Sequence, residues 1–74
     1  MKITNTTDLG NLIRTTRKNA KLTQAELAAS SGIGERFIRE LEKGKPSCQL
    51  AKALLVIQML GIKVEVQSPP IDEQ

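Results

Sequence analysis

The stretch that decides the fold runs from residue 24 to residue 41 and reads QAELAASSGIGERFIREL. Ala28 stands where two crossing helices leave room only for a small side chain. Gly32 stands where the chain must turn through a left-handed conformation. Three apolar positions would then fill the wedge between the helices. The full set of spaced positions is that of a helix-turn-helix: Gln24, Ala28, Gly32, Ile33, Ile38 and Leu41.

Capping signals mark the starts of two helices. Asn5 is a good N-cap for a helix that runs to residue 19, and Asp8 resembles the acidic half of a capping box. Thr23 and Glu26 form a clearer capping box at the start of the second helix. The apolar residues of the first helix share one face, with i, i+3, i+4 spacing: Leu9, Leu12 and Ile13.

Two further helices and one strand are predicted after the turn. A third helix covers residues 35–43 and ends at Gly44. Ser47 is a candidate cap for a fourth helix over residues 48–60, whose inward face would be Leu50, Leu54, Ile57 and Leu60. Residues 62–66 then alternate apolar with charged side chains and contain three β-branched residues. This pattern predicts a strand with one buried face.

The composition excludes several classes of protein. The 74 residues allow one domain and include one Cys and no His, so the commonest general base is missing and structural zinc is not expected. There is no nucleophile–base constellation, no Gly-rich phosphate loop and no membrane-spanning apolar run. The first five residues do not read as a signal peptide. We therefore expect a cytoplasmic protein that is not an enzyme and needs no cofactor.

Charge divides the chain unequally. Residues 1–60 hold ten Lys and Arg against five Asp and Glu, whereas residues 61–74 hold one Lys against three acids. A basic body of this kind is compatible with a polyanionic partner, although ordinary solubilising charge explains it as well.

Three short motifs carry a resemblance to a known family. Residues 22–28 (LTQAELA), the Gly32-Ile33 turn and residues 41–46 (LEKGKP) resemble the Xre/Cro-type regulators over residues 5–60. The strand that follows Leu60-Gly61 is similar to that of the HipB antitoxins. The resemblance implies a mainly α fold, with a lambda-repressor-like domain of four or five helices and one C-terminal β-strand that pairs across a dimer. It also implies a transcriptional repressor.

The resemblance assigns roles to the second and third helices. The second would cross the DNA backbone, and the third would enter the major groove. Arg36 is the expected base reader, because its guanidinium can bond guanine O6 and N7 together. Glu35 could accept from cytosine N4 or simply complement the helix dipole, and Arg39 could bind phosphate or pair with Glu35. The expected DNA-binding residues are Thr23, Gln24, Gly34, Glu35, Arg36, Arg39, Glu40, Lys43 and Lys45.

Other residues are expected to support the structure. The resemblance implies a partly buried ion pair between Arg17 and Glu42. For Thr23 the role of helix N-cap is the safer interpretation. For Phe37, the one aromatic residue, the safer interpretation is packing in the core. Arg14 and Lys18 are exposed candidates for weak backbone contact, and Cys48 is expected to be inert.

A lone strand predicts an oligomer, because its backbone groups have no ladder partner. Pairing of residues 61–67 about a two-fold axis would bury Ile62, Val64 and Val66 and place two recognition helices on an inverted-repeat operator. Alternatively, residues 2–4 pair with this strand within the chain. Residues 68–74 would form a flexible tail.

Partner assignments rest on the resemblance. It implies double-stranded DNA and a HipA-type serine/threonine kinase toxin, which the protein would neutralise while autoregulating its promoter. A stand-alone or phage Xre-type regulator and a protein-only adaptor are the other two interpretations.

Overall fold

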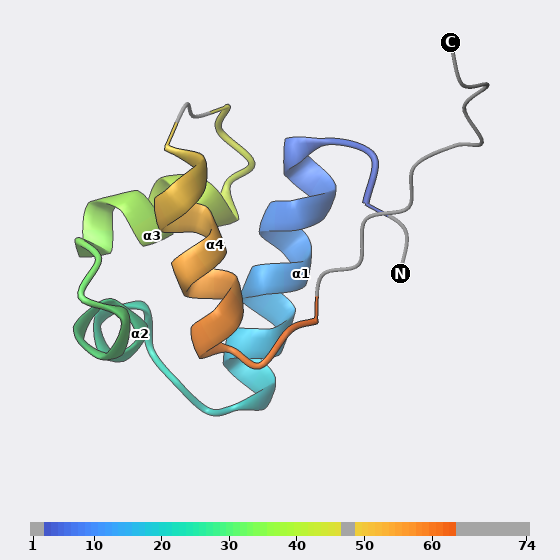
Figure 1. Ribbon diagram of the computed structural model, residues 1–74. Coiled ribbons are helices and arrows are strands. Elements are labelled where there is room, and N and C mark those ends of the chain that lie inside the picture. Colours follow the sequence, from blue (N-terminus) through green and yellow to red (C-terminus); the bar gives the residue numbers. More distant parts are fainter. Residues whose placement is uncertain (1–2, 47–48, 64–74) are drawn as a thin grey trace, which may run out of the picture.

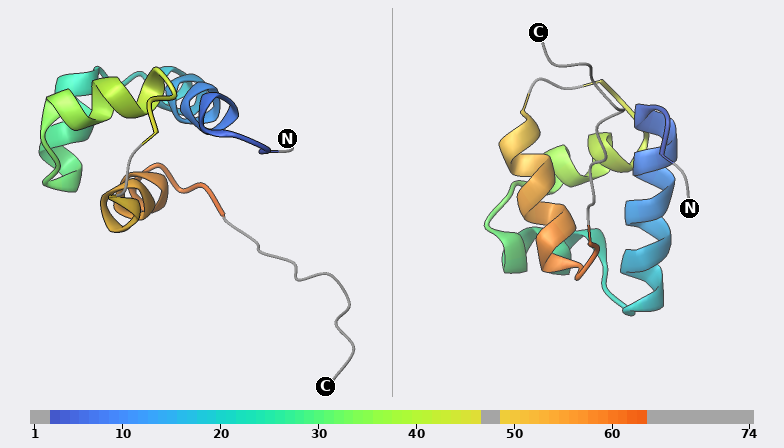
Figure 2. Two further views of the ribbon diagram at one scale, coloured as in Figure 1. Left: turned by 90° about the horizontal axis from the view of Figure 1, so that it is seen from above. Right: turned by 45° about the vertical axis from the view of Figure 1, so that its right-hand side comes forward.

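Four α-helices make up the described part of the computed structural model, which covers residues 3–46 and 49–63 (Figure 1). They are α1 (Thr6–Asn19), α2 (Gln24–Ser31), α3 (Glu35–Glu42) and α4 (Leu50–Met59). Figure 1 looks almost along α2 while α3 runs across the picture, so the two helices meet at a steep angle. Seen from above, α1, α2 and α3 form one layer and α4 lies beneath it (Figure 2). The mainly helical, helix-turn-helix architecture is thereby confirmed.

Local hydrogen bonds fix both ends of α2. The Thr23 hydroxyl accepts from the Glu26 N–H at 3.0 Å, and the Glu26 carboxylate accepts from the Thr23 N–H at 2.8 Å. At the other end Gly32 has φ 72°, a left-handed conformation that glycine adopts without strain. The Ile33 N–H then donates to the Ala28 carbonyl at 3.2 Å. These contacts turn the chain sharply into α3.

The start of α1 differs in one detail from the predicted capping box. The Asn5 side chain does accept from the Asp8 N–H, at 2.8 Å. The Asp8 carboxylate, however, turns to Thr4, accepting from its N–H at 3.1 Å and from its hydroxyl at 2.8 Å. Thr4 offers the Asp8 carboxylate two hydrogen-bond donors, its N–H and its hydroxyl, whereas the Asn5 backbone offers only one. The carboxylate therefore binds Thr4, the residue before the N-cap.

The core forms where all four helices meet. One fully buried large side chain comes from each helix: Ile13, Leu27, Ile38 and Val56. Ile33, Leu41, Ala53 and Ile57 complete the buried cluster. The apolar residues of the turn and of α3 therefore occupy the wedge that their spacing predicts.

The fourth helix is shorter than predicted and buries a different face. It begins at Leu50, with Gln49 as N-cap, and Ser47 and Cys48 lie outside the described residues. Its buried residues are Ala53, Val56 and Ile57, so the prediction that Leu50 and Leu54 point inward is wrong. Both are exposed, Leu50 by 66% and Leu54 by 38%. Because α4 is apolar around most of its circumference, helical spacing alone fits more than one face.

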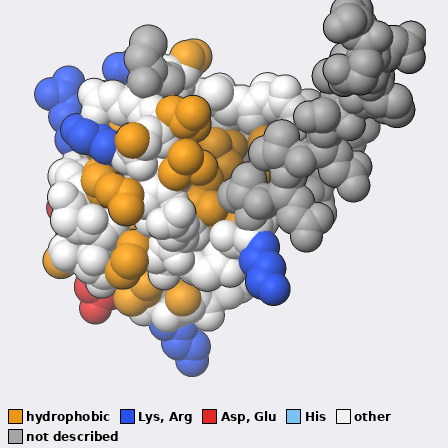
Figure 3. Space-filling model, viewed as in Figure 1, with side chains coloured by type: hydrophobic (Ala, Val, Ile, Leu, Met, Phe, Trp, Pro, Cys, Tyr) orange, Lys and Arg blue, Asp and Glu red, His pale blue; other side chains and the backbone are white. Residues whose placement is uncertain are grey.

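A row of large apolar side chains consequently faces outward on α4. We call it the α4 apolar face, and it consists of Leu50, Leu54, Leu55 and Met59. Figure 3 shows hydrophobic side chains gathered over this side of the molecule. Several exposed large apolar side chains on one helix are compatible with an interaction site.

The predicted strand is not confirmed. Ile62 does not begin a strand, because its N–H donates to the Ile57 carbonyl at 3.1 Å and closes the last turn after α4. Val64 and Val66 lie outside the described residues, and no strand occurs within residues 3–46 and 49–63. In that same part of the chain, no helix has the length and apolar character needed to cross a membrane.

Candidate DNA-binding surface

The outward side of α3 carries alternating charges that pair along the helix. Arg36 Nε lies 3.5 Å from Glu40 Oε2, and Arg39 Nη2 lies 3.9 Å from Glu35 Oε2. Both contacts join residues one helical turn apart, and contacts of this kind contribute only a few tenths of a kcal/mol. The Arg36 side chain remains 84% exposed. The Arg36 guanidinium is therefore bound only weakly by Glu40 and can exchange this carboxylate for another hydrogen-bond acceptor.

Glu40 stands between two cations. Its carboxylate accepts a hydrogen bond from Lys45 Nζ at 3.3 Å, and Arg36 approaches the same oxygen. The hydrogen bond from Lys45, together with the two positive charges, lowers the pKa of the Glu40 carboxyl. Glu40 thus stays ionised, but its charge is matched by its neighbours. An acid in this position is compatible with an anionic ligand only because of this compensation.

Gly34 is the N-cap of α3 and lies at the surface. Its backbone is extended, with φ −62° and ψ 145°, and makes no side-chain cap hydrogen bond. A Cβ built at this position would meet no atom within 4 Å. Neither backbone strain nor internal packing therefore requires glycine here. A bare backbone at this point leaves room for close approach by a second molecule.

A buried ion pair joins the end of α3 to α1. Arg17 Nε lies 2.6 Å from Glu42 Oε2, and Arg17 Nη2 donates to Glu42 Oε1 at 3.0 Å. The third arm of the guanidinium donates to the Leu22 carbonyl at 2.8 Å. Hydrogen bonding to Glu42 raises the pKa of Arg17, so the guanidinium stays charged. Each side-chain nitrogen of Arg17 and each carboxylate oxygen of Glu42 has a hydrogen-bond partner in the protein, as a buried pair requires.

Gln24 belongs to the same network. Its Nε2 donates to Glu42 Oε1 at 3.1 Å, which ties the start of α2 to the end of α3. The side chain predicted to meet a phosphate is thus held by the protein through its amide nitrogen. The neighbouring Thr23 hydroxyl is used in the α2 capping box.

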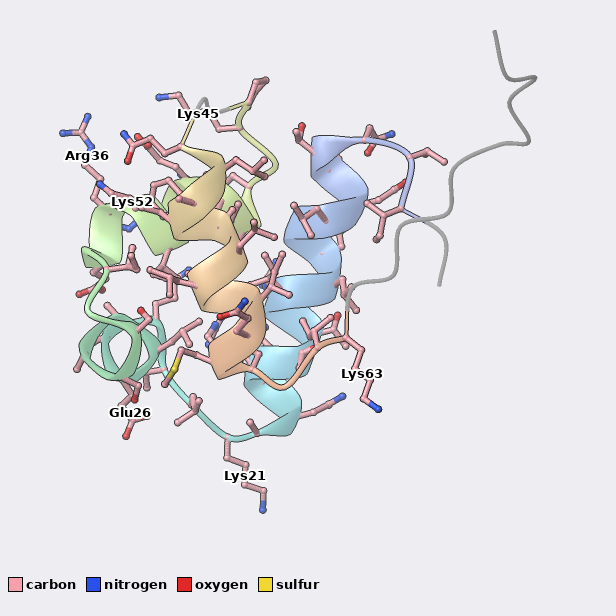
Figure 4. The ribbon with its side chains drawn as sticks, in the orientation of Figure 1. Lys21, Glu26, Arg36, Lys45, Lys52 and Lys63 are labelled. Atoms are coloured by element: carbon pink, nitrogen blue, oxygen red, sulfur yellow. The ribbon has the colours of Figure 1, made fainter. Side chains whose placement is uncertain are left out.

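Lys52 is a residue that sequence reasoning missed. Its Nζ lies 5.7 Å from the centroid of the Phe37 ring, a distance typical of a cation–π contact. Figure 4 shows it at the same end of the molecule as Arg36 and Lys45, whereas Lys21 and Lys63 lie at the opposite end. Phe37 itself is partly buried and packs against the core. Only the fold brings α4 beside α3, so no local pattern in the sequence could have indicated Lys52.

The arrangement offers ionic and hydrogen-bonding recognition. Within residues 3–46 and 49–63, no group of three or more His, Cys, Asp or Glu side chains is placed to hold a metal ion. The site is instead a helix with exposed cations and lightly held acids, mounted on a helix-turn-helix scaffold.

Comparison with known proteins identifies the class. Residues 13–67 match the helix-turn-helix family model. The chain therefore belongs to the Xre-type helix-turn-helix family and is a transcriptional regulator.

Individual similar proteins are known in addition to the family match. An uncharacterized HTH-type transcriptional regulator of Sinorhizobium fredii, y4mF, is 47% identical over 62 residues, which cover 84% of this chain and 82% of that protein. Three similar solved structures are described as "MDT Protein", "Structure of HipA-HipB-O2-O3 complex" and "HipB-O4 20mer complex". Each has a TM-score of 0.82 and 26% identity, over 95% of this chain and 99% of the other.

Proposed function

We propose that this regulator is a sequence-specific DNA-binding repressor, and that it acts as the antitoxin of a HipA-type serine/threonine kinase toxin whose operon it autoregulates. The observation that carries the DNA-binding part is the exposed side of α3, where Arg36 is 84% exposed on a helix fixed by buried contacts. A rigid helix that presents a mobile guanidinium suits direct readout of a base edge.

The nine residues predicted from the sequence fit this proposal in two groups. Gly34, Glu35, Arg36, Arg39 and Glu40 lie at the start of α3 or along it and would face the major groove. The others, which would meet phosphates, are Thr23, Gln24, Lys43 and Lys45. Phosphate contacts position the protein, and base contacts specify the site.

Two substitutions test this division. Arg36→Ala should relax the choice at one base pair, with a loss of about 1–3 kcal/mol on the cognate duplex and little loss on others. Lys45→Ala should weaken binding to all sequences alike. Selection of bound duplexes from a random pool, followed by affinity measurements on cognate and scrambled DNA, would show both patterns. Equal losses on all sequences for Arg36→Ala would rule it out as a base reader.

The salt dependence of duplex binding separates a DNA-binding regulator from a protein-only adaptor. Two copies that neutralise about eight to ten phosphates predict a log–log slope of about −7 to −9. Binding that is absent at low salt, or that does not change with salt, would favour the adaptor.

We further propose that the protein is a homodimer with residues 5–60 as the DNA-binding domain, 61–67 as the dimerisation strand and 68–74 as a tail. The α4 apolar face supports the dimer, because the strand would follow α4 directly in the chain. Two paired strands carrying Val64 and Val66, with Ile62 in the turn before them, would then cover apolar surface that is otherwise exposed to water. The pairing would set two copies of α3 about 34 Å apart, one turn of DNA.

Leu54→Glu should weaken the dimer at least tenfold, because it would place a charge in the apolar interface. Leu54 is 38% exposed and does not belong to the buried core cluster, so the domain itself should still fold. Sedimentation equilibrium would give the dissociation constant, and circular dichroism would check the helices. Asn11→Glu, at an exposed residue of α1, is the matched control. A wild-type chain that stays monomeric at micromolar concentration would contradict the dimer.

The toxin partnership rests on similarity to the HipB structures, one of which is described as a complex with HipA. A stand-alone Xre-type regulator is the second candidate, since y4mF is named only as a transcriptional regulator. Co-purification with a kinase encoded beside this gene, and loss of that kinase's activity in the complex, would favour the antitoxin. The absence of any such neighbouring gene would favour the second candidate.

A further inference from the structure

A hydrogen bond joins the start of α1 to the loop that follows α3. The Thr6 hydroxyl donates to the Gly44 carbonyl at 2.6 Å, across 38 positions of the sequence. Figures 1 and 2 show this loop passing beside the start of α1. The two backbones also lie in close contact, because a Cβ built at Gly44 would be 2.7 Å from the Thr7 Cα. The loop after α3 is therefore packed directly on α1.

The peptide unit between Gly44 and Lys45 is held from both sides. Its carbonyl accepts from Thr6, and its N–H, which belongs to Lys45, donates to the Glu40 carbonyl at 3.1 Å. A peptide unit is planar, so one hydrogen bond at each of its polar groups fixes its orientation. Pro46 restricts the backbone further, since the residue before a proline is confined mainly to extended conformations. Together these constraints set the direction in which the Lys45 side chain leaves the backbone.

The residue held in this way is one of the cations proposed to meet DNA. The Lys45 side chain is 61% exposed, and its Nζ lies 3.3 Å from Glu40 Oε2 on α3. A lysine on a freely moving loop loses conformational freedom when it binds an anion, and that loss weakens binding. A loop that is already fixed in the free protein avoids part of the loss.

We propose that Thr6 is a positioning residue for DNA binding, and that its hydrogen bond to Gly44 holds Lys45 where the ammonium can meet the duplex. The proposal rests on the proposed DNA-binding function. It adds to that function a residue of α1 that acts through the loop after α3 and not by contact with DNA.

Thr6→Val tests the hydrogen bond, because valine keeps the shape of threonine and removes the hydroxyl. Duplex affinity of a dimer should fall about tenfold, on cognate and scrambled DNA alike, since both copies of Lys45 must then be ordered on binding. Thr6→Ser keeps the donor and should stay within about twofold of wild type.

Thr7→Val is the matched control. It makes the same chemical change at the next residue, whose side chain makes no hydrogen bond within residues 3–46 and 49–63. Its duplex affinity should equal that of wild type. Circular dichroism at the assay temperature would check that each variant is folded.

A double-mutant cycle with Lys45→Ala separates positioning from a merely structural role. If Thr6 acts through Lys45, Thr6→Val should lower affinity by less than about twofold once Lys45 has been replaced. The stability measured by thermal unfolding should behave differently. Thr6→Val should lower the thermal midpoint equally with Lys45 or with alanine at this position, because the hydrogen bond to Gly44 is lost in both cases.

Two results would overturn the assignment while leaving the proposed function intact, in a wild-type protein that binds duplex. One is an affinity for Thr6→Val equal to that of Thr7→Val. The other is a loss of affinity for Thr6→Val that is just as large in the Lys45→Ala background, since Thr6 would then act by another route. Failure of the wild type to bind any duplex would instead contradict the proposed function, and this inference with it.

Discussion

Glu42→Ala should destabilise the domain by about 3–5 kcal/mol, because it leaves a buried guanidinium without its counter-charge. Arg17 is only 8% exposed, and Glu42 accepts two of its hydrogen bonds. Gln24 would lose its partner as well. A domain of this size has a total stability of similar magnitude, so a large share of the variant should be unfolded at 25 °C.

Urea denaturation followed by circular dichroism would measure this loss. Glu35→Ala is the matched control, an exposed acid on the same helix whose removal should cost less than about 1 kcal/mol. Glu42→Gln keeps a hydrogen-bond acceptor and the shape of the side chain but removes its charge. Its loss of stability should therefore lie between those of Glu42→Ala and Glu35→Ala. The double change Arg17→Met with Glu42→Leu should be milder than Glu42→Ala, since no unpaired charge remains. A stability within 1 kcal/mol of wild type for Glu42→Ala would show that the pair is not buried in solution.

Gly10→Ala should also be strongly destabilising, although helix propensity predicts the opposite. Alanine in the middle of α1 should by itself gain about 0.5–1 kcal/mol over glycine. In the structure, however, a Cβ at residue 10 would lie 2.6 Å from the Leu41 carbonyl oxygen and 2.7 Å from that of Glu42. Both are backbone atoms at the end of α3, so they cannot move aside as a flexible side chain would. Helix α1 would have to shift away from α3, with a net loss of about 2–3 kcal/mol.

Asn11→Ala provides the control for propensity. Asn11 is the next residue of α1 and is exposed, so alanine there should stabilise by a few tenths of a kcal/mol. The two variants should therefore move the thermal midpoint in opposite directions. If Gly10→Ala stabilised the protein as Asn11→Ala does, the close approach of α1 to α3 would be wrong.

Much of the fold could be predicted because its signals are local. The Thr23–Glu26 capping box and the Gly32 turn join residues at most five apart, and both are visible as short motifs. The spacing of the turn residues predicted which side chains of α3 are buried, and Ile38 and Leu41 are buried. The exposed charges of α3 were predicted in the same way, while their contacts with DNA remain predictions.

The errors came where a pattern fitted more than one arrangement. Helical spacing in α4 allowed Leu50 and Leu54 to be taken as core residues, but the small Ala53, with Val56 and Ile57, faces inward. The strand that alternation after Gly61 predicts stays a prediction, because the Ile62 N–H closes the turn after α4 while Val64 and Val66 lie outside the described residues. Both patterns are present in the sequence. What decides between the arrangements that each pattern allows is the surface against which the segment packs, and the sequence pattern does not contain it.

The sequence by itself determined the helix-turn-helix and the ends of α2, because hydrogen bonds between near neighbours and the conformational freedom of Gly32 act before any tertiary contact forms. Only the tertiary structure decided what depends on distant residues. Gln24 meets Glu42 across 18 positions, Gly10 touches the end of α3, and Thr6 donates to Gly44 across 38 positions. Such contacts require helices from separate parts of the chain to pack together. Periodicity within one helix shows its apolar face, but it does not show which residues of another helix that face will meet.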